Sequence, residues 1–176
     1  MGLFLLYLLS CMATQQYSIL KVNHSEVLEA AVVGPPIQKA QWKEPPLIRI
    51  CKTTGVDLFR VQKAIKYWEM LGYEFGNIKV DYEAACMEPR HGEIIITLPD
   101  GNINNDHIAA TRIYTEKIRG NIAKAKIFIF PKYARRERVI EHELGHALGW
   151  QHYKQKFHIM HPDWQSGGYG HSGLRK

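Results

Sequence analysis

Apolar and polar positions alternate in several short stretches of this chain, and each such stretch predicts a β-strand. Ile78, Val80 and Tyr82, for example, recur at every second position, which places them on one face of an extended segment. Turn-forming residues separate the stretches, and Gly120 sits where a hairpin turn is expected. We expect four to five strands, drawn from Leu47–Ile50, Phe75–Tyr82, Glu93–Leu98, Ile113–Ile118 and Ala125–Phe130.

Two longer stretches follow the period of an α-helix. The first runs from Val56 to Leu71, and Gly72 follows it as a helix-ending residue. The second runs from Tyr133 to Gly149. The order of strand, helix, four strands and helix predicts an α+β domain in which two long helices pack on one mixed, twisted sheet. The apolar face of the first helix consists of Val61, Ala64, Ile65, Trp68 and Leu71.

Length and composition fit one globular domain. The chain has 176 residues, of which 45% are apolar and 23% are charged, and these values are ordinary for a folded protein. Regular patterning starts near residue 46, so we place the domain at residues 46–176. Residues 14–45 are interpreted as an extended leader or linker, because Gly34-Pro35-Pro36 and Pro45-Pro46 disfavour a helix.

Residues 1–13 have the features of an export signal. The apolar run from Leu3 to Leu9 is too short to span a bilayer, which needs roughly 20 residues, but it has the length of a signal-peptide core. Leu8-Leu9-Ser10-Cys11 resembles a lipoprotein signal that would leave Cys11 lipidated, whereas cleavage after Ala13 would remove this cysteine. We therefore expect a protein that is secreted or lipid-anchored at the cell surface. A buried N-terminal strand or helix is the alternative, because no Lys or Arg precedes the run.

One segment near the C-terminus carries the residues of a catalytic zinc site. From His142 to His152 the chain matches His-Glu-x-x-His-x-x-Gly-x-x-His at all five specified positions. Residues four apart share one face of a helix, so the imidazoles of His142 and His146 can bind one ion. Gly149 can adopt a left-handed backbone that turns the chain and returns His152 as a third ligand. Three imidazoles leave an open fourth position for water, and Glu143 is placed to act on that water as general base.

A methionine turn follows the zinc motif at His158-Ile159-Met160-His161-Pro162. The motif and this turn together resemble the metzincin clan of zinc endopeptidases, and residues 142–162 are most similar to the matrixins, although Tyr153 stands where matrixins commonly have serine. The resemblance implies a single metzincin-like domain that hydrolyses peptide bonds of a polypeptide substrate. Met160 would pack beneath the imidazoles without binding the metal.

Two other functions are compatible with the same residues. A non-catalytic, zinc-bearing surface or adhesion module would keep the three histidines, although such a module has no need of Glu143. A zinc hydrolase that cuts the peptide crosslinks of a cell wall would use the same chemistry on another substrate.

Which cysteines can pair depends on whether Cys11 is kept as a free thiol. If Cys11 is lipidated or removed, Cys51 and Cys86 remain as a pair. Two cysteines in an exported protein favour a disulfide between them. Two separate thiols are the alternative.

A polar loop near residue 100 has a pattern that is partly that of a calcium site. Asp100, Asn102, Asn104 and Asp106 alternate there, and such oxygen ligands suit Ca²⁺. The loop lacks the glycine and the glutamate of a calcium-binding loop, so an Asx-rich turn fits it better.

Positive charge is concentrated in one part of the sequence. The formal net charge is +6, and residues 112–138 hold nine basic side chains against two acidic ones. A basic face there could dock on an anionic polymer or a membrane surface, while an ordinary solvated surface is the alternative. No RNA-binding or helix-turn-helix pattern is present, so a nucleic-acid partner is not expected.

Overall fold

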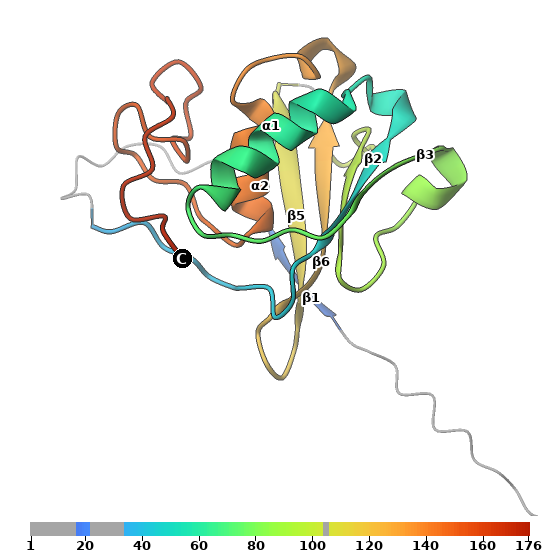
Figure 1. Ribbon diagram of the computed structural model, residues 1–176, viewed down its shortest axis with the longest axis horizontal. Helices are drawn as coiled ribbons and strands as arrows, with labels where there is room; N and C mark the ends of the chain where they lie inside the picture. The colour runs from blue at the N-terminus through green and yellow to red at the C-terminus, as the bar shows by residue number, and fades with distance from the viewer. Residues whose placement is uncertain (1–16, 22–33, 104–105) are drawn as a thin grey trace, which may run out of the picture.

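The computed structural model describes residues 17–21, 34–103 and 106–176, and it has the predicted α+β architecture (Figure 1). Within these residues, six strands form one mixed sheet in the order β1-β5-β6-β4-β2-β3. Strand β5 is antiparallel to its two neighbours, and the other pairings are parallel. The strands are β1 (Tyr17–Lys21), β2 (Leu47–Cys51), β3 (Ile78–Asp81), β4 (Glu93–Thr97), β5 (Ala109–Glu116) and β6 (Ile122–Ile129).

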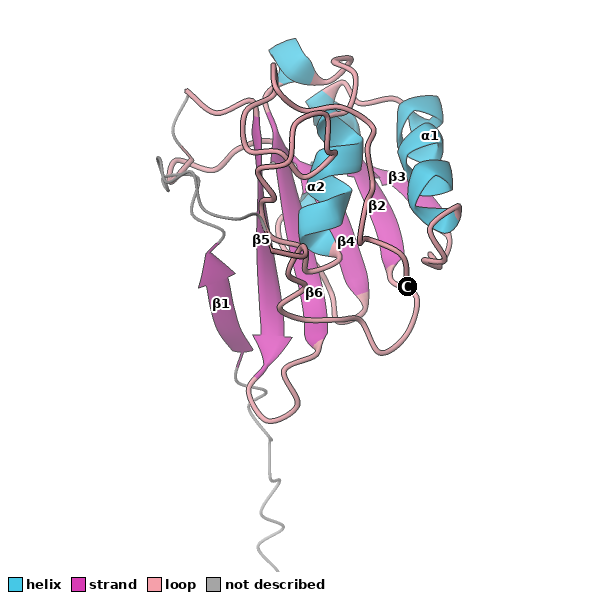
Figure 2. Cartoon of the chain, turned by 90° about the vertical axis from the view of Figure 1, so that its left-hand side faces the viewer, coloured by secondary structure: helices cyan, strands magenta, loops and turns pink. Residues whose placement is uncertain are grey.

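Helices α1 (Leu58–Glu69) and α2 (Val139–Ala147) pack on the same face of the sheet (Figure 2). Helix α1 starts where the Asp57 carboxylate accepts a hydrogen bond from the Arg60 amide at 2.7 Å, an ordinary N-cap. Trp68 of α1 is fully buried, and its indole N–H donates to the Glu141 carbonyl of α2 at 2.8 Å. The core beneath the helices includes Ile48, Ile50, Ile94, Ile96, Ile127 and Ile129.

The five stretches predicted as strands all form strands, but two of them extend further than predicted. Strand β5 begins at Ala109, four residues before the predicted start, and β6 begins at Ile122. The small residues Ala109 and Ala110 have little strand preference of their own. They are extended because they pair with Ile129 and Phe128 of β6, so the pairing overrides the local preference.

Helix α2 is shorter than the predicted helix, which was expected to begin at Tyr133. Residues Pro131–Tyr133 form a 3₁₀ turn, and Arg138 has a left-handed backbone with φ of 63°. A left-handed residue cannot lie inside a right-handed helix, so α2 starts at the next residue, Val139. The shift matters for the site, because it leaves the segment before α2 free to form a pocket wall.

The leader region contributes to the fold in two places. Tyr17–Lys21 forms β1 at the sheet edge, paired with Arg112–Glu116 of β5. Residues 37–42 lie against the C-terminal end of α2 through hydrogen bonds given below. The predicted export signal at residues 1–13 lies outside the described residues. No helix in the described part of the chain is long and apolar enough to cross a bilayer.

A disulfide and a network of ion pairs connect residues on the opposite face of the sheet. Cys51, the last residue of β2, forms a disulfide with Cys86. The buried Arg49 side chain bonds to Glu93 of β4 at 2.6 Å and also pairs with Asp81 of β3. Buried charges need such partners, so this network accounts for the polar residues inside the sheet.

Candidate metal centre

Helix α2 presents two histidines whose ring orientation is set by backbone carbonyls. The Nδ1 of His142 lies 2.6 Å from the Ile159 carbonyl oxygen, and the Nδ1 of His146 lies 2.8 Å from the Trp150 carbonyl oxygen. A carbonyl oxygen only accepts hydrogen bonds, so each Nδ1 must carry the proton. Each neutral ring therefore keeps a lone pair on Nε2, which is the state in which histidine binds metals.

The third histidine is brought back by a turn at Gly149. This glycine has φ of +93°, and a Cβ placed on it would lie 2.0 Å from the Ala40 carbonyl oxygen. Only glycine fits both requirements. Ala40 comes so close because the leader segment pairs with the turn: the Lys39 amide donates to the Gly149 carbonyl at 2.9 Å, and the Gln151 amide donates to the Ile37 carbonyl at 3.0 Å.

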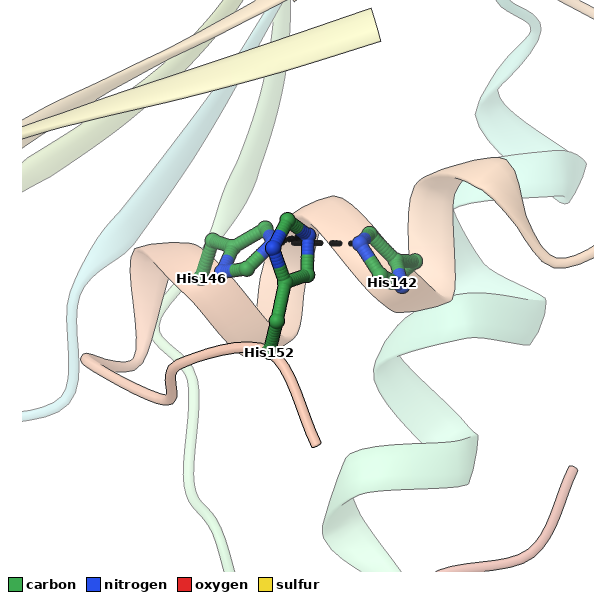
Figure 3. Close-up of side chains that lie close together, drawn as sticks. All are labelled: His142, His146 and His152. Atoms are coloured by element: carbon green, nitrogen blue, oxygen red, sulfur yellow. Dashed lines mark hydrogen bonds between the residues drawn. The ribbon is translucent and has the colours of Figure 1, made fainter. Parts of the chain in front are cut away.

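The three imidazoles converge on one point (Figure 3). The Nε2 atom of His146 lies 3.0 Å from that of His142 and 3.1 Å from that of His152. Ligand nitrogens bound tetrahedrally about 2.0–2.1 Å from one ion would lie about 3.3–3.4 Å apart. Lone pairs that face one another at such distances repel, and a shared cation would remove that repulsion. The three histidines could therefore hold a metal ion.

Glu143, the residue predicted as general base, is buried beside this cluster. Its Oε2 accepts a hydrogen bond from the Thr111 hydroxyl of β5 at 2.6 Å. Burial raises the pKa of the Glu143 carboxyl to about 7, although the Thr111 hydrogen bond acts in the opposite direction. A cation at the histidines would also favour the ionised carboxylate. The contact makes Thr111 a site residue, and its only sequence signal was its position just before a predicted strand.

Met160 is fully buried under α2. A Cβ added to Gly145 would lie 2.3 Å from the Met160 sulfur and 2.7 Å from Trp68, so the glycine between the two helical histidines lets the methionine approach the helix. The Met160 carbonyl accepts a hydrogen bond from the Tyr153 amide at 2.8 Å. The methionine turn is thus bonded to the residue that follows the third histidine.

The other predicted features have more ordinary surroundings. The Asp100 carboxylate accepts a hydrogen bond from the Asn102 amide, which is an Asx turn, and it also pairs with Arg112 at 3.3 Å. Lys126 is buried and bonds to Glu88 at 2.5 Å. Arg112 and Lys126, two basic side chains of residues 112–138, therefore form ion pairs with other described residues. Whether the others dock on an anionic surface stays a prediction.

His158, which the sequence places in the methionine turn, has a supporting role. It is buried, its Nδ1 accepts a hydrogen bond from the Met160 amide at 3.1 Å, and its Nε2 lies 3.2 Å from the Ser172 carbonyl. Burial lowers the pKa of this imidazole. His158 therefore supports the turn from within the core.

No protein-family model matches this chain, and a search of curated proteins finds no match. The resemblance to metzincins and matrixins accordingly rests on residues 142–162. What the structure shows is an α+β fold whose second helix carries two of three histidines that could bind a metal ion.

Proposed function

We propose that this chain is a zinc-dependent endopeptidase with a metzincin-like, most nearly matrixin-like, catalytic site. The observation that carries the proposal is the convergence of three Nε2 atoms from His142, His146 and His152, two of them held by backbone carbonyls. Three neutral imidazoles form the ligand set of several catalytic zinc sites, and a structural site usually has a fourth protein ligand. Glu143 adds the carboxylate that hydrolysis requires.

The donor set favours zinc over harder cations. Imidazole nitrogen suits zinc and its neighbours among the transition metals, whereas Ca²⁺ and Mg²⁺ take oxygen ligands. Among the described residues, the three histidines are the only group of three or more potential ligands close enough to share an ion. Bound there, zinc would polarise the scissile carbonyl and bring the pKa of a water towards neutrality.

A carboxylate beside the histidines would then transfer the proton. Glu143 would take a proton from the attacking water and pass it to the amine that leaves, so that a peptide bond and one water become a carboxylate and a protonated amine. The Thr111 hydroxyl holds one carboxylate oxygen at 2.6 Å. This contact leaves the other oxygen available and limits the rotation of the side chain.

Export and a polypeptide substrate belong to the same proposal. A signal at residues 1–13 would deliver the chain to the cell exterior, where a disulfide such as Cys51–Cys86 is stable. Sequencing the N-terminus of the protein recovered outside expressing cells tests this point. Recovery of uncleaved, unlipidated protein inside the cells alone would contradict it.

The central test is digestion of a random peptide library by zinc-loaded wild type, Glu143→Ala and Glu137→Ala. Glu137 is exposed and close in sequence, so it controls for the loss of a carboxylate near the site. We expect Glu143→Ala to lose about 100- to 10,000-fold in rate, the range for a general base, while Glu137→Ala and the zinc content stay unchanged. A chelator should abolish cleavage.

Two results would overturn this function. Equal cleavage by wild type and Glu143→Ala would exclude Glu143 as the general base of the reaction. Zinc bound in equal amount with no cleavage of any peptide would favour the non-catalytic module, unless crosslinked cell-wall peptides, added as a separate substrate, are cut.

A further inference from the structure

A pocket of about 400 Å³ opens beside His142 and Glu143. Its walls come from three places in the chain: the segment before α2 with Arg136, the loop after the methionine turn with Trp164, and the residues just before β5 with Ile108. The volume is within the range that binds small ligands or side chains. A side chain next to the bond being cut would have to enter this space, because the pocket adjoins the predicted base.

The wall between Arg136 and Trp164 is well anchored. The Arg136 guanidinium lies over the Trp164 ring at 3.7 Å from its centroid, a stacked cation–π contact. The Trp164 indole N–H donates to the Glu137 carbonyl at 3.2 Å, and the Trp164 carbonyl accepts from Arg138 at 3.1 Å. The Arg138 guanidinium also lies over the Trp164 ring, at 4.4 Å from its centroid. The tryptophan is thus fixed by four contacts, and it stacks on the guanidinium of Arg136, which lines the same pocket.

In the described part of the chain, no ion pair neutralises the positive charge of Arg136. Among the residues that the structure describes, no carboxylate lies within 4.0 Å of its guanidinium. Asp163, which also lines the pocket, accepts hydrogen bonds from the Gln165 and Ser166 amides and from the Ser166 hydroxyl. Asp106 is exposed to solvent, where water and salt screen its charge.

We propose that Arg136 makes this pocket a carboxylate-reading subsite, which selects peptides with Asp or Glu within one or two residues of the scissile bond. The inference rests on the proposed peptidase function. A stacked guanidinium keeps several N–H donors free in its plane, and these suit a carboxylate in a bidentate arrangement. A free C-terminal carboxylate presents the same chemistry, so the experiment separates the two sources.

The test compares matched peptides on the full-length, zinc-loaded protein. One peptide has an internal Glu and an amidated C-terminus, a second has Gln in its place, and a third has Gln with a free C-terminus. We expect kcat/KM for the Glu peptide to exceed that for the amidated Gln peptide by about 10-fold, the lower end for a hydrogen bond to a charged group. A preference for the third peptide instead would assign the carboxylate to the chain end.

Three variants link the preference to one side chain. Arg136→Met keeps an unbranched stem but removes the charge, and we expect it to lose the Glu preference while retaining cleavage of the Gln peptide. Arg136→Lys should retain part of the preference. Arg135→Met is the matched control, since Arg135 is exposed and does not line the pocket. Equal Glu preference in wild type and Arg136→Met, or a preference for basic peptides in wild type, would refute the proposal.

Binding separates failure of this inference from failure of the peptidase function. Calorimetric titration of zinc-loaded Glu143→Ala with the Glu and Gln peptides requires no turnover. About 10-fold tighter binding of the Glu peptide, lost when Arg136→Met is added, would support the subsite even if wild type cleaves nothing. Equal binding of both peptides would refute it even if wild type is an active peptidase.

Discussion

The two regions that supply the three candidate metal ligands are built in different ways. His142 and His146 lie one turn apart on α2, so a helix of ordinary geometry already places them together. His152 lies on an irregular turn whose position depends on Gly149 and on residues 37–42 of the leader. Two of the candidate ligands are therefore placed together by one helix, whereas the position of the third depends on a segment more than 100 positions earlier in the sequence.

The leader segment holds the turn and the end of the helix through several direct contacts. Two side chains of the segment add to its backbone pairing. The Trp42 indole N–H donates to the Ala147 carbonyl at 2.8 Å, and the Gln38 side-chain amide donates to the Leu148 carbonyl at 2.8 Å. These carbonyls lie at the end of α2, where helical partners run out. The segment therefore caps the C-terminal end of α2 and also holds the turn at Gly149.

The largest effect should come from removing a helical ligand. We expect His146→Ala to weaken zinc binding on the order of 100- to 1000-fold, a share of the free energy that a full set of ligands supplies. It should also lower the free energy of unfolding by about 1–3 kcal/mol, because the buried Trp150 carbonyl loses its partner. Competition with a chromophoric chelator and urea denaturation measure the two quantities.

His152→Ala provides the contrast within the same experiment. It should weaken zinc binding in the same range but leave the unfolding free energy of the zinc-free protein nearly unchanged, since His152 is only half-buried and on a turn. Equal destabilisation of the zinc-free protein by both substitutions would contradict the distinction between the two regions.

Gly149→Ala should have the next largest effect, acting on the turn alone. The left-handed backbone costs an alanine about 1–2 kcal/mol, and the new Cβ would displace the leader segment from the turn. We expect zinc affinity to fall about 10- to 100-fold, as when a group that orients a ligand is lost. Gly101→Ala is the control, since nothing lies within 4 Å of a Cβ placed there. Unchanged zinc affinity in Gly149→Ala would show that His152 does not depend on this turn.

The smallest effect should come from Trp42→Phe, which keeps an aromatic ring but removes the hydrogen bond to α2. A net loss of about 1 kcal/mol of folding free energy is expected for one such bond, with a reduction in zinc affinity of only a few fold. The exposed neighbour Lys43→Ala should change neither quantity. If Trp42→Phe behaves like Lys43→Ala, the leader acts on the turn through its backbone pairing alone.

Much of the fold follows from patterns of short range. The apolar run in Glu93–Leu98 and the helical spacing in Val56–Leu71 are local, and a strand and a helix form close to these places. The start of α2 was wrong by six residues, because the left-handed backbone at Arg138 leaves no mark in the hydrophobic pattern. Strand β1 was not predicted either, since its partner β5 lies about 95 positions later.

The candidate site also has some features that local residue spacing predicts and others that it does not. The spacing of His142, Glu143 and His146 indicated a metal-binding helix face without any knowledge of the fold, because a helix fixes which side chains share a face. Several contacts that position these groups join residues farther apart in the sequence: the Ile159 carbonyl with His142, the Thr111 hydroxyl on β5 with Glu143, and the Trp164 ring with Arg136. Contacts of this kind depend on sheet register and loop path, which residue spacing does not encode.

Residue spacing alone therefore identified three histidines that could bind a metal and the carboxylate beside them. That a leader of ordinary appearance holds the turn of His152, with the Ala40 carbonyl against Gly149, could be seen only in the folded chain. The two kinds of information differ in how far along the sequence they reach. Backbone geometry relates residues within one or two turns of a helix, whereas the position of a turn depends on whichever distant segment packs and hydrogen-bonds against it.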